Sequence, residues 1–226
     1  MNKISEKKKV IHSLLFPLFF VFILWMIKIS EYVLSVHFYT LGIYPRELHG
    51  LLGILTAPLI HEDFNHLISN TIPLFVLMFA TFYFYRKIAY KVFFFNYIIS
   101  GIWVWIMARS AYHIGASGLV YSFAAFIITS GIIRNNIRLL AISLVVVFLY
   151  GSLAWGLFPT LPKISWESHL MGAISGIVMA VYYKKEIVFE EGLPSFRFDE
   201  YYEEKFWETD FTSKETEINY EYKEKK

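Results

Sequence analysis

The stretch GASGLVYSFAAFIITSGII, residues 115–133, carries no charged side chain. After its small opening residues it continues as an apolar run, close to the roughly 20 residues with which an α-helix crosses about 30 Å of hydrocarbon. Similar runs with few charges recur along the chain, at residues 10–30, 63–85, 88–107, 138–157 and 166–183. We therefore predict an all-α, polytopic membrane protein in which these six runs form a bundle of transmembrane helices.

The composition favours a lipid environment and excludes several classes of function. Hydrophobic residues make up 56% of the 226 residues, above the roughly 45–50% that is usual for a soluble domain. The chain has no cysteine, which excludes disulfides, thiolate nucleophiles and cysteine metal sites. Its net charge is only +2 and it has no compact basic stripe, which argues against a nucleic-acid partner. No cofactor is predicted.

Basic residues in the short connections predict the orientation of the bundle. With a cytoplasmic N-terminus, four basic residues lie outside, namely Lys28, Arg46, Arg109 and Lys163. Eleven then lie inside: Lys3, Lys7, Lys8, Lys9, Arg86, Lys87, Lys91, Arg134, Arg138, Lys184 and Lys185. We therefore expect both termini in the cytoplasm.

The chain divides into a membrane part and a tail. We predict that residues 1–186 form one membrane-embedded domain. Its first apolar run lacks a small-residue cleavage site, so we interpret it as a retained helix. The long outer connection at residues 31–62 is apolar enough to be partly buried. Residues 187–226 are rich in charged and aromatic residues and are predicted to form a cytosolic, partly disordered tail.

Polar side chains inside predicted spans are costly in lipid and are therefore candidates for function. Ser117 follows Gly115 and Ala116 and opens an apolar helix. Taken alone, it is best explained as a helix cap. However, backbone N–H groups at a helix N-terminus can also stabilise an oxyanion that forms beside them.

His169 begins a helical stripe of small residues that continues through Gly172 and Gly176. The run that starts at Ser117 offers a matching stripe, which consists of Gly118, Ser122 and Ala125. Small residues at this spacing let transmembrane helices approach closely, which would bring the imidazole near the serine. The alternative is a packing motif in which His169 is bonded to a backbone carbonyl. Glu167 is two residues from His169 and points roughly the other way, so a dyad is predicted rather than a triad.

His66 and Asn70 are four residues apart and share one face of the second predicted helix, where both can donate to an oxyanion. His61 lies before that helix, in the preceding connection. A metal site formed by His61, His66 and His169 is disfavoured, because no intramembrane carboxylate completes it and the histidine spacing fits no common metal motif. No metal is predicted.

Tyr121 lies one helical turn beneath Ser117, where its ring can pack against an imidazole from the last helix. An ordinary interfacial tyrosine is the alternative.

The residues described above, from His61 to Gly176, closely resemble the rhomboid family of intramembrane serine proteases in order and spacing, over roughly residues 40–183. The resemblance implies that Ser117 is the nucleophile and His169 the general base and acid, with Tyr121 packing against the imidazole. It implies an oxyanion hole of His66, Asn70 and the Ser117 N–H, with Gly115 and His61 in support.

The family further implies a bacterial six-helix enzyme of the inner membrane. Its partners would be single-span transmembrane proteins, cleaved near the outer face of the lipid bilayer. The chain departs from the family in having Arg46 after Pro45 rather than after a tryptophan, and in its tail. Two alternatives are a catalytically inactive rhomboid-like binder or chaperone and a small transporter. No oligomeric state is predicted.

Overall fold

The computed structural model describes residues 6–159 and 165–186. Each of the six predicted ranges overlaps one long helix, and the all-α fold is confirmed for the described residues. The long helices are α1 Glu6–Leu34, α3 Phe64–Phe84, α4 Ala89–Met107, α5 Ser117–Ile133, α6 Ile137–Tyr150 and α7 Trp166–Tyr182. The 3₁₀ helix η4, Gly151–Leu157, continues directly from α6. The predicted tail, 187–226, lies outside the described residues.

Four of the described helical segments are long and apolar enough to cross a membrane: Glu6–Leu34, Phe64–Phe84, Ala89–Met107 and Ile137–Leu157. The other two long helices, α5 and α7, have 17 residues each. Buried residues are spread all around α5, which fits a central helix surrounded by others rather than one exposed to lipid. The count of six spans therefore stays a prediction.

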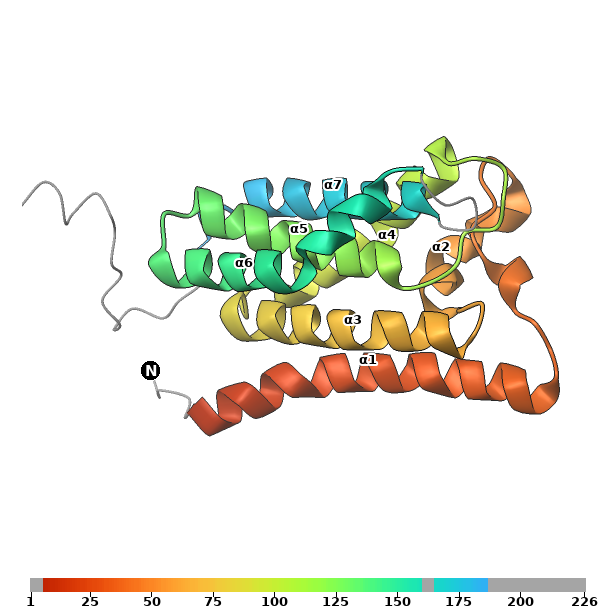
Figure 1. The fold of residues 1–226 in the computed structure, drawn as a ribbon, viewed down its shortest axis with the longest axis horizontal. Helices are drawn as coiled ribbons and strands as arrows, with labels where there is room; N and C mark the ends of the chain where they lie inside the picture. Colours follow the sequence, from red (N-terminus) through yellow and green to blue (C-terminus); the bar gives the residue numbers. More distant parts are fainter. Residues whose placement is uncertain (1–5, 160–164, 187–226) are drawn as a thin grey trace, which may run out of the picture.

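The helices lie roughly along one direction (Figure 1). In this bundle α1 packs beside α3, α5 packs against α3, α6 and α7, and α4 packs mainly against α7. The start of α1 and the end of α7 lie at the same end (Figure 1). Which side of a membrane this end faces stays a prediction.

The opposite end, which we call the loop end, holds the connections at residues 35–63 and 108–116. The first connection folds into short helices: η1 Tyr39–Leu41, η2 Leu48–Leu51, α2 Gly53–Thr56 and η3 Ala57–Leu59. Some of its residues are buried within the protein, including Ile43 and Ala57, whereas Leu48, Leu52 and Leu55 are exposed. Partial burial of this connection in the membrane interface stays a prediction. The backbones of Ile43 and His113 form an isolated antiparallel bridge that ties the two connections together.

Arg46 stands where the family has a tryptophan–arginine pair, but here Pro45 replaces the tryptophan. Its guanidinium donates to the Ala108 carbonyl at 2.7 Å, just beyond the last residue of α4. A tryptophan is nevertheless present here, because Trp105 of α4 donates its indole N–H to the Glu47 carbonyl at 3.0 Å. The connection is therefore anchored to α4 by an arginine and a tryptophan from different parts of the chain.

Lys28, counted among the outer basic residues, lies within the predicted run 10–30 and is buried in α1, which continues to Leu34. Its charge is balanced by Glu31, at 3.0 Å. The side of the membrane that Lys28 faces stays a prediction.

Candidate active site

The two residues predicted as a dyad are brought together at the loop end. Ser117 is the first residue of α5 and His169 lies in the first turn of α7. His169 Nε2 lies 2.8 Å from Ser117 Oγ, and His169 Nδ1 lies 2.9 Å from the Gly156 carbonyl oxygen. Because a carbonyl only accepts, Nδ1 carries the proton of the neutral ring, and Nε2 is left to accept from the serine hydroxyl. His169 therefore bonds both a backbone carbonyl and the serine hydroxyl.

Direct backbone contact between α5 and α7 fixes this distance. A Cβ added at Gly172 would lie 2.1 Å from the Gly118 carbonyl oxygen, and one added at Gly176 would lie 2.0 Å from that of Ser122. Real side chains cannot approach backbone so closely, so only glycine fits at both positions. The stripe of small residues in the sequence thus sets the separation of the two helices.

Tyr121 stacks on the imidazole. Its ring centroid lies 4.2 Å from that of His169, with 9° between the planes. Its hydroxyl donates to the Leu153 carbonyl at 2.7 Å, which orients the ring from η4. The imidazole is thus held by a carbonyl on one edge and an aromatic face beneath it.

Gly115 turns the chain toward α3 just before the serine. Its φ is +108°, a conformation that L side chains rarely adopt, and a Cβ there would lie 2.9 Å from His66 Nε2. Asn70 follows one turn after His66, is only 6% exposed, and its Nδ2 has no hydrogen-bond partner among the described residues. An unpaired buried donor is costly, and here it lies beside the turn that leads to Ser117.

His61 supports the same turn from the first connection. Its Nε2 accepts from the Ala116 N–H at 3.4 Å, and its ring centroid lies 5.1 Å from that of His66. Burial lowers the pKa of His61 to about 3, with the neighbouring His66 acting in the same direction. The ring is therefore neutral at ordinary pH, as an acceptor must be.

A family model described as "Rhomboid domain" matches residues 48–186, which is more than half of the chain. The chain belongs to the rhomboid family. Members are usually intramembrane serine proteases, although many are inactive. Because it belongs to this family and has several apolar helices, this rhomboid is an integral membrane protein.

This rhomboid is 33% identical over 177 residues to an uncharacterized protein of Mycobacterium tuberculosis (strain H37Rv), with 71% of each chain covered. An uncharacterized protein of Mycobacterium bovis matches to the same extent. One from Mycobacterium leprae is 32% identical over 171 residues, which cover 71% of this chain and 67% of the relative. No solved structure matches the chain.

Two polar contacts of this rhomboid were not predicted from the sequence. Glu167, set aside as a triad member, is 6% exposed and pairs with Arg109 at 3.3 Å, not with His169. His113 bonds the Ser165 hydroxyl through Nδ1, and burial lowers its pKa. Each contact joins the connection before Ser117 to the start of α7. For Glu167, the signal in the sequence was a carboxylate in the first turn of an apolar helix.

Gly156 is a further residue that was missed. Its carbonyl orients His169, and a Cβ there would lie 3.1 Å from His169 Nδ1 and closer still to the Tyr121 hydroxyl. A single glycine in a stretch with little helical periodicity gave no indication in the sequence that it would contact His169. Among the described residues, no group of three histidine or acidic side chains could hold a metal ion.

Proposed function

We propose that this rhomboid is an intramembrane serine endopeptidase that uses Ser117 as nucleophile and His169 as general base and acid. The observation that carries the proposal is the 2.8 Å contact between His169 Nε2 and Ser117 Oγ, on an imidazole whose other nitrogen is held by the Gly156 carbonyl. A nucleophile within hydrogen-bond reach of a base, with the base oriented by a third group, is the arrangement that activates serine.

In the acylation step, Ser117 Oγ attacks the carbonyl carbon of the scissile peptide while its proton moves to His169 Nε2. The imidazolium that forms is stabilised by the Gly156 carbonyl at Nδ1 and by the Tyr121 ring face, at 4.2 Å between centroids. His169 then protonates the leaving amine, and the C–N bond breaks. Water hydrolyses the acyl-enzyme with His169 again as base, which returns the proton to Ser117.

The oxyanion that forms during both steps needs donors on the α3 side of Ser117. Asn70 Nδ2 is buried and unpaired among the described residues, and the His66 imidazole lies against Gly115, two residues before the serine. Together with the Ser117 N–H they are the proposed oxyanion donors. Donors fixed in advance lower the barrier most, because they need no reorganisation as charge develops.

The proposed substrates are single-span transmembrane proteins, cleaved where their helix unwinds near the outer face. With both termini in the cytoplasm, as the basic residues predict, the loop end and Ser117 face outward. We also propose that the chain crosses the membrane six times and lies in the bacterial inner membrane.

The test is cleavage of a single-span reporter by purified protein in liposomes. Ser117→Ala and His169→Ala should each lower kcat by roughly 10³-fold or more. Ser122→Ala is a matched control, because Ser122 is a buried serine five residues further along α5 whose hydroxyl donates to the Leu119 carbonyl. It should retain cleavage.

Cleavage that survives Ser117→Ala would overturn the mechanism. An inactive membrane binder would instead give no cleavage by the wild type and no labelling of Ser117 by a fluorophosphonate.

A further inference from the structure

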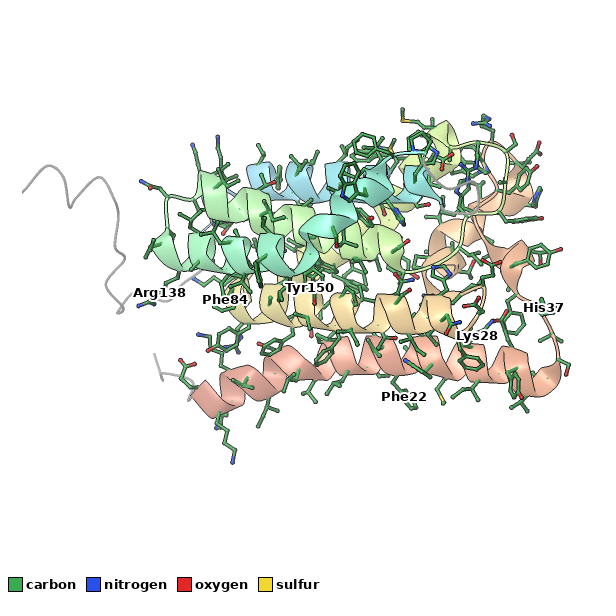
Figure 2. The ribbon with its side chains drawn as sticks, in the orientation of Figure 1. Phe22, Lys28, His37, Phe84, Arg138 and Tyr150 are labelled. Carbon is green, nitrogen blue, oxygen red and sulfur yellow. The ribbon has the colours of Figure 1, made fainter. Side chains whose placement is uncertain are left out.

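A buried ion pair lies near the end of α1, outside the segment that the family model matches. Lys28 and Glu31 are 8% and 4% exposed, and Lys28 Nζ lies 3.0 Å from Glu31 Oε2. Phe22, by contrast, lies on the exposed face of α1 and points away from the other helices (Figure 2). Buried charges in a membrane protein are expensive and are usually kept for a purpose.

The Lys28 ammonium uses all three of its N–H donors. Besides Glu31 it donates to the His61 carbonyl and to the Glu62 carbonyl, each at 2.9 Å. Glu31 is held in turn, because its Oε1 accepts from the Phe38 N–H at 2.7 Å. The pair thus binds α1 to the segment that leads into α3.

That segment, residues 57–63, carries the contacts on which the α3 side of the active site depends. The Ala57 carbonyl accepts from the Gly115 N–H at 2.9 Å, and His61 Nε2 accepts from the Ala116 N–H. Asp63 caps α3 by accepting from the His66 N–H at 2.7 Å. A shift of this segment would therefore move both the turn before Ser117 and the start of α3.

We propose that Lys28 is a positioning residue: supported by Glu31, it fixes segment 57–63 and thereby the oxyanion donors of α3 relative to Ser117. The inference rests on the proposed proteolytic function. A misplacement of about 1 Å can cost roughly 10²-fold in rate, and the effect falls on kcat because the donors act on charge that exists only in the transition state.

Lys28→Met removes the ammonium while it keeps a long apolar side chain. We expect kcat to fall about 10- to 100-fold, with KM within about threefold of the wild type. Because this change leaves Glu31 buried and unpaired, the double variant Lys28→Met/Glu31→Gln is made alongside it. The double variant should fold more stably than Lys28→Met but show the same loss of kcat.

Thr71→Val is the matched control for a purely structural role of α1. It removes the hydrogen bond from Trp25 Nε1 to Thr71 Oγ1, 3.1 Å, which also joins α1 to α3 but touches no part of segment 57–63. Its thermal midpoint should fall while kcat stays unchanged.

Amide hydrogen exchange provides a readout that does not need cleavage. Both Lys28 variants should speed exchange in residues 57–66 and 113–118, and Thr71→Val should not. Unchanged exchange in these residues would overturn the inference. So would a Lys28→Met variant whose thermal midpoint falls while its kcat stays at the wild-type value, as expected for Thr71→Val. If the wild type neither cleaves nor labels at Ser117, the proposed function fails, and the exchange pattern still decides whether Lys28 positions the segment.

Discussion

The α5–α7 contact and the α1–α3 contact both join long apolar helices, but they are made of different atoms. In α5–α7, the glycines of α7 meet carbonyl oxygens of α5. In α1–α3, side chains meet: Phe16 stacks on Phe82 at 5.1 Å between ring centroids, and the Ser13 hydroxyl donates to the Phe82 carbonyl at 3.1 Å. The α5–α7 contact is backbone against backbone and has no rotatable side chain, whereas the α1–α3 contact includes side chains that can rotate.

This difference matches what each contact has to hold. The α5–α7 contact carries both atoms of the proposed dyad, whose separation must stay within hydrogen-bond reach. The contacts of Phe82 with Phe16 and Ser13 carry no reacting atom and lie near the end of α3 that is farther from Ser117. Backbone packing is thus found where the two atoms of the proposed dyad must stay close, and aromatic side-chain packing is found farther from them.

The largest effect is expected from Gly172→Leu, which breaks the backbone contact. Its side chain would have to displace α5, because even a Cβ would lie 2.1 Å from the Gly118 carbonyl oxygen. We expect destabilisation of about 1–3 kcal/mol or more from overpacking, and loss of at least about 10²-fold in cleavage as His169 moves away from Ser117. Thermal unfolding and reporter cleavage measure the two.

Gly151→Ala is the control for that substitution. A Cβ there meets only Val147 Cγ1, at 3.9 Å, an ordinary contact. Wild-type cleavage by Gly172→Leu would show that the α5–α7 distance does not matter.

Asn70→Ala should come next, with kcat lower by about 10²- to 10³-fold, as for loss of one oxyanion donor. Because Asn70 Nδ2 is unpaired among the described residues, removal of the amide should not lower the thermal midpoint. Asn96→Ala is the matched control, since Asn96 is also buried, with an amide that has no hydrogen-bond partner among the described residues, but lies on α4. Equal losses of kcat in both variants would contradict a specific role for Asn70.

A smaller effect is expected from pH. His61 has a folded pKa of about 3 against about 6.5 when unfolded, so below about pH 6.5 the unfolded chain binds more protons than the folded one. Stability should therefore fall as the pH drops from about 6.5 toward 3. The thermal midpoint of His61→Gln should depend less on pH between 7 and 5 than that of the wild type.

The exposed His37, on the same connection, gives the control His37→Gln, which should retain the full wild-type pH dependence. An identical slope in wild type and His61→Gln would show that His61 is not held neutral by burial.

The smallest effect is expected from Tyr121→Phe. The ring that stacks on His169 is kept, and only the hydroxyl bond to the Leu153 carbonyl is lost. We expect about 1 kcal/mol of lost stability and a kcat within about threefold of the wild type. Tyr121→Ala, which removes the ring, should lose clearly more activity. If the two variants were equally impaired, the hydroxyl rather than the stacked ring would be the important group.

Much of the site was readable from sequence because its parts follow short periodicities. The i, i+4 spacing of His66 and Asn70 placed both on one face of α3, and the spacing of Gly172 and Gly176 marked the contact face of α7. The stacked position of Tyr121 followed from the same rule. Helical geometry is local, so a spacing in sequence fixes a direction in space.

The sequence by itself determined that this is an apolar chain of the rhomboid family whose described part is all-α, with a serine and a histidine each at the start of a helix. Only the tertiary structure decided what surrounds them: the Gly156 carbonyl on His169, the Arg109–Glu167 pair, and the Lys28 ammonium on the His61 carbonyl. These contacts join segments far apart in sequence. No periodicity encodes such pairs, because their distances depend on how whole helices and connections pack.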